Sequence, residues 1–471
     1  MNKEMHYFIE NINNYNISEI VEKIEDIFKE ISNSDISFDD FLNLAIKTVK
    51  DIKIKALLLK SYFTIEGMEN FNTYYYWNNI ISILKDLKSE DRIFIFRFLF
   101  NNLTFESISM PLNIPNNLKF GIELEYTDLY LDTIKQLFSN GMIDDIMKAL
   151  SIPEEIILNI LNNYDFEVKN EFNKWIFSRE ITDSCPEIST PILCNNTKSI
   201  DSLNAIVLLF NALGANTGGR TGLHINIGVD FFANNPIAIK YLLIIWSECE
   251  ELFYKIANEE NIEIRYDAIN MAIPIKKNIQ KTLKENKEFE FTSKETFGSF
   301  LFDIQVRERL KSLTSYEDYR NAKTTKKKIL LYRKYLDYCE KINMDSKTRY
   351  TSVNFNHMSW YCEDKGRIEF RLFNSSLSFD VVLENILLVS KLCETCLSLA
   401  SENKKYNEFS ALLNHQISEE EKLDLLLDLL FDSNETKEIF RQRYNSVKDN
   451  DRYKSYQSGE KTYIKSNNRT I

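Results

Sequence analysis

Two acidic residues alternate with apolar residues in the short stretch "FGIELEY", residues 120–126. In a strand, a period of two sends Glu123 and Glu125 to one face and the apolar side chains to the other. Two like charges side by side on a half-buried strand need a reason. A solvent-facing strand edge would explain a single pair of this kind. The pair therefore indicates a functional site only if other strands also carry polar residues on one face.

Three more strand-like stretches carry polar groups on one face. They are "PEISTPIL" with Glu187, "GLHINIG" with His224 and Asn226, and "RIEFRLF" with Arg367, Glu369 and Arg371. Gathered on one sheet, the carboxylates would need cations, and carboxylates with one imidazole suit Mg²⁺ or Mn²⁺. No thiolate ligand is present, which disfavours structural zinc. Arginines beside such a site, namely Arg367, Arg371 and Arg349, suit phosphate, so the pattern predicts two divalent ions and a nucleoside triphosphate.

His224 stands within a cluster of glycines. Five of the 11 glycines in the chain fall in the 15 residues from Gly214 to Gly228. A chain so poor in glycine uses it where the backbone turns sharply or approaches a ligand closely. We therefore predict His224 as a site residue and interpret the other three histidines, His6, His357 and His415, as ordinary core or surface residues.

The four motifs in this order resemble the amidoligase family, the carboxylate-amine ligases related to glutamine synthetase and glutamate-cysteine ligase. The resemblance covers roughly residues 117 to 400, apart from an insertion, and implies a glutamine synthetase-like curved antiparallel sheet flanked by helices. It implies ATP and Mg²⁺ or Mn²⁺ as cofactors, and catalytic roles for Glu123, Glu369 and Arg371, with Arg371 on the nucleotide phosphate. The metal ligands that it implies are Glu123, Glu125, Glu187, His224 and Glu369.

The sequence departs from the family pattern at two places. Asn226 stands where amidoligases usually have a second histidine, which alters a metal-proximal or substrate contact. The middle strand region has one clear glutamate where glutamine synthetase uses two, with Asp183 or Glu180 as substitutes, so the number of metal ions stays open. Arg220, in the glycine-rich loop, and Arg265 are candidate clamps for a substrate carboxylate, although surface ion pairs explain them equally well.

Composition bounds the class of protein. A chain of 471 residues with 44% hydrophobic content can bury a large core, and a formal charge of −12 disfavours nucleic acid or an anionic membrane as the main partner. No run of 18 apolar residues and no signal-peptide pattern occurs, so we expect a cytoplasmic protein. Seven scattered cysteines make no disulfide framework, and the pair in "CETC", Cys393 and Cys396, is interpreted as buried and apolar.

The placement of glycine and proline predicts three regions in an α+β chain. Residues 1–114 form an all-helical N-terminal domain that ends in the linker "MPLNIPNN", and residues 115–400 form the amidoligase-like catalytic domain. Residues 276–345 are a helical insertion with 17 Lys/Arg against 11 Asp/Glu. The insertion is interpreted as a lid, as a docking site for an acidic partner, or more simply as a solvated helix face. Binding of nucleic acid to the insertion is not excluded. Residues 401–471 form C-terminal helices and a polar tail, loosely held beyond about residue 433.

The leading hypothesis is an ATP-dependent carbon-nitrogen ligase that forms an amide or isopeptide bond through an acyl phosphate. Its substrates would be small molecules, peptides or proteins that bear a carboxylate and an amine. One alternative is a phosphotransferase resembling the guanidino kinases, which stops at phosphoryl transfer. The other alternative is a degenerate ligase that has lost catalysis and serves as an interaction module. Asn226, which departs from the amidoligase pattern, would favour this alternative.

Overall fold

The structure is a computed structural model that describes most of the chain outside one long central segment. The described residues are 3–32, 38–65, 73–108, 112–167, 173–179, 185–218, 221–232, 235–257, 272, 274–276, 279–280, 327, 330, 351–355, 366–402 and 405–448. The chain forms two compact units. The first contains Met1–Met110, Tyr126–Pro191 and Thr197–Asn216, and the second contains Pro111–Glu125, Ile192–Asn196 and Thr217–Ile471.

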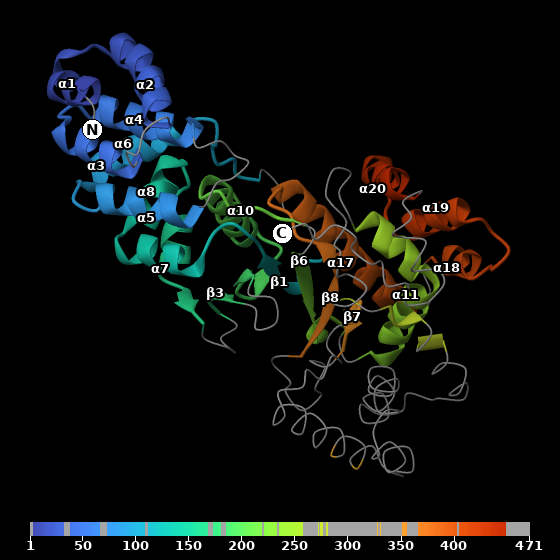
Figure 1. The fold of residues 1–471 in the computed structure, drawn as a ribbon. Helices are drawn as coiled ribbons and strands as arrows, with labels where there is room; N and C mark the ends of the chain where they lie inside the picture. Colours follow the sequence, from blue (N-terminus) through green and yellow to red (C-terminus); the bar gives the residue numbers. More distant parts are fainter. Residues whose placement is uncertain are drawn as a thin grey trace. The chain divides into compact units, whose positions relative to one another are not determined.

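The first unit is mainly helical, as Figure 1 shows in blue and teal. Its helices are α1 (Lys3–Asn11), η1 (Ile12–Asn14), α2 (Ile17–Ser32), α3 (Phe38–Thr48), α4 (Ile52–Ile65), α5 (Thr73–Leu84), α6 (Ser89–Leu99), α7 (Leu131–Ser139), α8 (Met142–Ala149), α9 (Glu154–Leu161) and α10 (Thr197–Ala212). Buried Asp145 on α8 accepts hydrogen bonds from Ser89 and Arg92 of α6, which locks these two helices together. The predicted N-terminal helical region is confirmed.

Three strands complete the described part of the first unit. They are β2 (Tyr164–Phe166), β3 (Trp175–Arg179) and β4 (Pro186–Ser189). β3 pairs with β2 in parallel and with β4 in antiparallel. Phe177 of β3 stacks on Phe210 of α10 with ring centroids 6.1 Å apart, so the apolar face of these strands packs on α10.

The second unit holds the remaining strands, β1 (Lys119–Glu125), β5 (Leu193–Cys194), β6 (Gly222–Gly228), β7 (Val353–Asn354) and β8 (Arg367–Asn374). β6 lies between β1 and β8, β5 pairs with the beginning of β1, and β7 pairs with β8, all antiparallel. The central register sets Glu123 opposite His224, and Asn226 opposite Glu369. Motifs that are far apart in the sequence therefore meet on adjacent strands.

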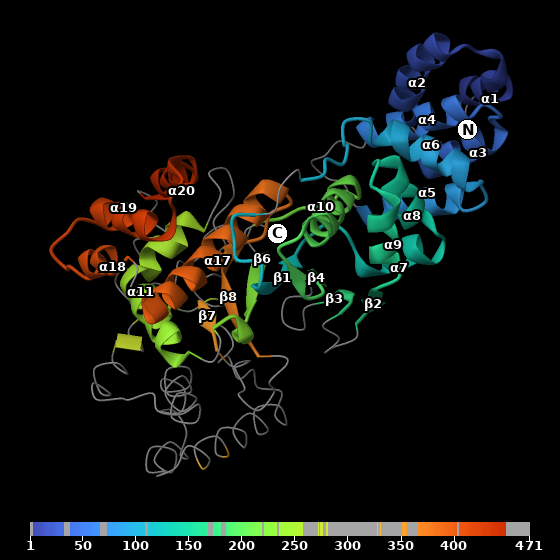
Figure 2. The ribbon, with the colours of Figure 1, turned by 180° about the vertical axis from the view of Figure 1, so that it is seen from behind.

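Helices of the second unit cover its sheet and extend beyond it, as Figure 2 shows from behind. Among the described residues they are η2 (Val229–Phe232), α11 (Pro236–Ile256), α17 (Phe379–Glu402), α18 (Tyr406–Leu412), α19 (Glu419–Leu430) and α20 (Asn434–Val447). Trp246 of α11 packs on Phe370 of β8 with ring centroids 5.4 Å apart. Because side chains alternate along a strand, Glu369 and Arg371 point away from α11, to the opposite face.

The predicted α+β class is confirmed, since every strand pairing given above except β2 with β3 is antiparallel and helices accompany the strands in both units. The finer expectation of a glutamine synthetase-like sheet stays a prediction, as do the three domain boundaries. Cys393 and Cys396 are fully buried in α17, and burial raises the pKa of both thiols, so the apolar interpretation of "CETC" is confirmed. Within the described residues, no helix is long and apolar enough to cross a membrane.

One prediction is wrong. The sequence predicts a loosely held tail beyond about residue 433, yet α20 runs from Asn434 to Val447 and buries Phe440, Arg443 and Tyr444. The buried arginine interrupts the apolar pattern of this helix, which is why periodicity does not reveal it. Residues 449–471 and most of the insertion 276–345 lie outside the described residues.

Candidate functional site

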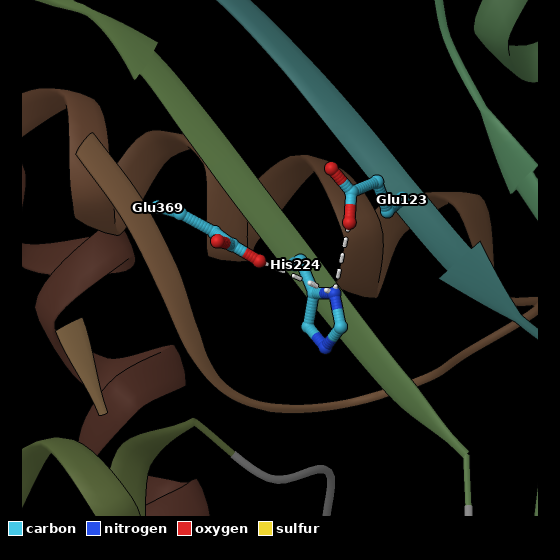
Figure 3. A group of neighbouring side chains, drawn as sticks. All are labelled: Glu123, His224 and Glu369. Carbon is cyan, nitrogen blue, oxygen red and sulfur yellow. Dashed lines mark hydrogen bonds and ion pairs between the residues drawn. The ribbon is translucent and has the colours of Figure 1, made fainter. Parts of the chain in front are cut away.

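The site lies on the polar face of β1, β6 and β8. His224 on the central strand β6 has Glu123 of β1 directly opposite, and Glu369 of β8 reaches the same imidazole. Figure 3 shows both carboxylates pointing toward the ring of His224 from neighbouring strands. This arrangement follows from the period of two in each strand, which gives all three side chains the same face.

Distances within this group are short enough for a shared cation. His224 Nδ1 lies 3.2 Å from Glu123 Oε2 and 3.6 Å from Glu369 Oε1. One ligand atom from each of Glu123, His224 and Glu369 falls within 4.8 Å of the others. On the other side of the ring, His224 Nε2 lies 3.6 Å from Glu125 Oε1. The three predicted carboxylate ligands on these strands therefore surround the imidazole of the fourth, His224.

Arg371 neutralises part of this negative charge. It forms an ion pair with Glu369, and its Nη1 lies 3.4 Å from His224 Nδ1. His224 Nδ1 thus faces a carboxylate, which needs a hydrogen on the ring, and a guanidinium, which needs a lone pair, and no single tautomer serves both. A cation between Glu123, Glu369 and a deprotonated Nδ1 would remove this conflict, so the residues present fit a hard divalent ion.

A second chain of contacts forms the more exposed edge of the site. Arg367 Nε donates to Asn226 Oδ1 at 3.0 Å, and Asn226 Nδ2 donates to Glu123 Oε1 at 3.1 Å. Asn226, which departs from the family pattern, therefore links a guanidinium to a carboxylate. The side chain of Glu123 is 22% exposed, whereas those of His224 and Glu369 are almost fully buried. Glu123 therefore forms the most exposed part of this group of three.

The surrounding charges keep Glu123 and Arg371 ionised. Burial acts to raise the pKa of Glu123, but the hydrogen bond and charge of His224, together with Arg367 and Arg371, lower it far below its usual range. Burial acts to lower the pKa of Arg371, but Glu369, Glu123 and Glu125 raise it above its usual value. The site therefore presents permanent negative and positive charge side by side.

The predicted residues fall into three groups. The structure brings together Glu123, Glu125, His224, Asn226, Arg367, Glu369 and Arg371. Glu187 lies on β4 of the first unit and accepts a hydrogen bond from Ser189 Oγ at 2.9 Å, so the cluster described above is formed without it and its role as a ligand stays a prediction. The candidate residues Arg220, Arg265 and Arg349, with Glu180 and Asp183, lie outside the described residues.

Sequence reasoning missed Asn354. This fully buried residue of β7 donates from Nδ2 to Glu369 Oε2 at 2.7 Å and pairs with Glu369 across the strands. It therefore fixes one oxygen of Glu369 while Arg371 holds the other. The stretch "TSVNF" shows the alternation of a strand, but a buried asparagine has no distinctive spacing that marks it as a site residue.

No protein-family model and no curated protein matches this chain. The resemblance to the amidoligases therefore stays a prediction from the four sequence motifs.

Proposed function

We propose that the protein is an ATP- and divalent-metal-dependent ligase that joins a carboxylate to an amine through an acyl phosphate. The main support is the group of Glu123, His224 and Glu369 beside Arg371 on one face of three adjacent strands. Hard oxygen ligands with one imidazole suit Mg²⁺ or Mn²⁺. The resemblance of the four motifs to the amidoligases points to the same chemistry.

The charge balance of the described face suits a divalent ion followed by phosphate. With His224 neutral, as metal binding requires, Glu123, Glu125 and Glu369 carry three negative charges, and Arg367 and Arg371 carry two positive charges. One divalent ion would turn this small excess of negative charge into a small excess of positive charge. A metal ion bound there supplies the positive charge that draws in and neutralises the phosphates of ATP.

The proposed reaction requires no covalent bond between the protein and its substrates, so the protein mainly positions the reactants and stabilises charge. A substrate carboxylate oxygen attacks the γ-phosphorus of ATP, ADP leaves, and the resulting acyl phosphate is a good electrophile. The amine then attacks the carbonyl carbon, phosphate leaves, and the amine nitrogen loses its proton. Arg371 stabilises negative charge on the transferred phosphoryl group, and Arg367, held by Asn226 at the exposed edge, is placed to bind a phosphate or carboxylate oxygen.

Hydroxylamine trapping tests this proposal. The full chain is incubated with ATP, Mg²⁺ or Mn²⁺ and hydroxylamine across a panel of amino acids and short acidic peptides. We expect substrate-stimulated ADP release with hydroxamate, and a loss of about 100-fold or more in Glu123→Gln, because this change removes a charged ligand. Glu251→Gln, a partly exposed carboxylate on α11 that pairs with Lys276, is the matched control and should keep full activity.

Each other outcome favours a different class of protein. ADP release without hydroxamate would favour the phosphotransferase, because a guanidino kinase forms no acyl phosphate. Failure to bind ATP in the presence of metal would reject both enzymes and leave the interaction module. Glu369→Ala and Arg371→Ala would then leave the biological activity of the protein unchanged.

A further inference from the structure

A second buried carboxylate, Glu250 of α11, lies on the helix that packs against the opposite face of the sheet. It is 1% exposed and accepts hydrogen bonds from the side chains of Trp246 and Ser352. It also accepts from the backbone N–H groups of Ile275 at 2.9 Å and Lys276 at 2.7 Å. A buried carboxylate with this many donors is well satisfied, and it ties three separate parts of the chain together.

The contact with Ser352 leads directly to the site. The backbone carbonyl of Ser352 accepts a hydrogen bond from the N–H of Arg371 at 2.9 Å. The next two residues form β7, in which Val353 pairs with Phe370, and Asn354 pairs with Glu369. Asn354 then holds Glu369 through its side chain, as described above. One short segment therefore connects Glu250 to both Glu369 and Arg371.

We infer that Glu250 is a positioning residue for the proposed metal and phosphate site. A strand of two residues has too few ladder bonds to fix its own register firmly. Glu250 supplies an anchor by holding Ser352, and Trp246 Nε1 reinforces it by donating to Ser352 Oγ at 3.1 Å. With Ser352 held, Asn354 and the Ser352 carbonyl keep Glu369 and Arg371 at their places beside His224.

A purely structural role for Glu250 makes a different prediction. Trp246 also stacks on Phe253 with ring centroids 4.5 Å apart, so the network around Glu250 contributes to the packing of α11. If packing were its whole role, removing Glu250 would lower stability without changing the surroundings of His224. A spectroscopic signal from the His224 imidazole therefore distinguishes a positioning role of Glu250 from a purely structural role.

The experiment uses the full chain with ¹⁵N-labelled histidine side chains, in which His224→Gln assigns the His224 signals among the four histidines. Glu250→Gln keeps the size of the side chain, but it places an amide NH₂ donor opposite one of the backbone N–H donors of Ile275 and Lys276. Ser352→Ala removes the hydroxyl donor, keeps the carbonyl that Arg371 uses, and changes no charge. Glu251→Gln is the matched control, since Glu251 is the next residue and pairs on a partly exposed surface with the side chain of Lys276, not with the backbone N–H that Glu250 uses.

We expect the imidazole ¹⁵N signals of His224 to shift in Glu250→Gln and in Ser352→Ala, and to stay in place in Glu251→Gln. A shift in Ser352→Ala shows repositioning, because no charge was removed. His6 and His415 should be unchanged throughout, since both are exposed in the structure. Unchanged His224 signals in the folded variants would overturn the inference, and if Glu250→Gln fails to fold, Ser352→Ala decides alone.

The effect of Glu250 on catalysis rests on the proposed function. The effect of Glu250 on the position of His224, measured by the shift of the His224 signals, does not. Wild-type protein that neither binds Mn²⁺ nor forms hydroxamate would reject the function and leave the histidine spectra to decide the coupling. If the wild type is active, Glu250→Gln and Ser352→Ala should lose about 10- to 100-fold in activity, the usual cost of losing a group that orients a metal ligand. Glu251→Gln should lose none.

Discussion

Glu123 and Glu250 show how surroundings set the behaviour of the same side chain. At Glu123, the hydrogen bond and charge of His224 and two nearby arginines outweigh burial and lower the pKa. At Glu250, burial outweighs the hydrogen bonds that the carboxylate accepts, and its pKa is raised from 4.5. Glu123 is therefore held as an anion, whereas the anionic form of Glu250 has a cost in folding free energy.

The raised pKa of Glu250 predicts a pH dependence of stability. As pH rises, the unfolded chain releases this proton first, near 4.5, and the folded protein releases it only at higher pH. The stability contributed by Glu250 is thus present below 4.5 and lost as pH rises through the folded pKa. The glutamine in Glu250→Gln cannot titrate. The melting temperature of this variant should therefore rise relative to that of the wild type as pH rises.

Thermal unfolding of both proteins between about pH 4 and pH 8 measures this difference. Asn445→Ala, an exposed change on α20 that removes no ionisable group, is the control and should follow the wild type at every pH. A gap in melting temperature between Glu250→Gln and wild type that is constant, or that widens against the variant as pH rises, would contradict the assignment.

At the scale of elements, α20 depends on tertiary contacts more than on its own sequence. Phe440 is fully buried and stacks on Phe431 with ring centroids 5.1 Å apart. Arg443 donates to Asn385 Oδ1 at 2.8 Å and pairs with Glu384, both on α17. A helix with so many polar residues is held because its few apolar side chains and the buried Arg443 have partners outside the helix.

Phe440→Ala should therefore destabilise the protein by about 3 to 5 kcal/mol, the usual cost of removing a buried phenylalanine side chain. Urea unfolding of the full chain, followed by circular dichroism, measures the change. Asn445→Ala lies exposed on the same helix and should stay within about 0.5 kcal/mol of the wild type. Equal stability of the two variants would mean that α20 is not docked as described.

At the scale of the whole molecule, the site joins pieces of chain that the sequence keeps far apart. β1, β6 and β8 come from three distant stretches, and their polar face exists only in the folded state. A ligand that binds there binds the native state and not the unfolded chain. Binding must then raise the stability of the whole protein.

Mn²⁺ should thus raise the melting temperature of the wild type. At a free concentration of about 100 times Kd, the gain is about 2.7 kcal/mol. His224→Gln should lose this gain, because His224 touches all three carboxylates of the cluster. His415→Gln is the matched control, since His415 is exposed on the surface, and should keep the gain. Equal stabilisation of both variants by Mn²⁺ would place the ion elsewhere.

The sequence by itself determined the strands that carry the four motifs and the polar face of each, because both follow from local periodicity. "GLHINIG" matches β6, residues 222–228, and "RIEFRLF" lies within β8, Arg367–Asn374. The same alternation correctly placed Glu123 with Glu125, and Arg367 with Glu369 and Arg371, on single faces.

Only the tertiary structure decided which of these faces meet and what holds them. Strand order and register are contacts between residues far apart in sequence, so nothing local marks Asn354 as the partner of Glu369, or Glu250 as the anchor of Ser352. Nor does local pattern reveal α20, whose buried Arg443 is explained by its partners on α17. A polar residue can be buried wherever partners satisfy it, and those partners are known only once the chain has folded.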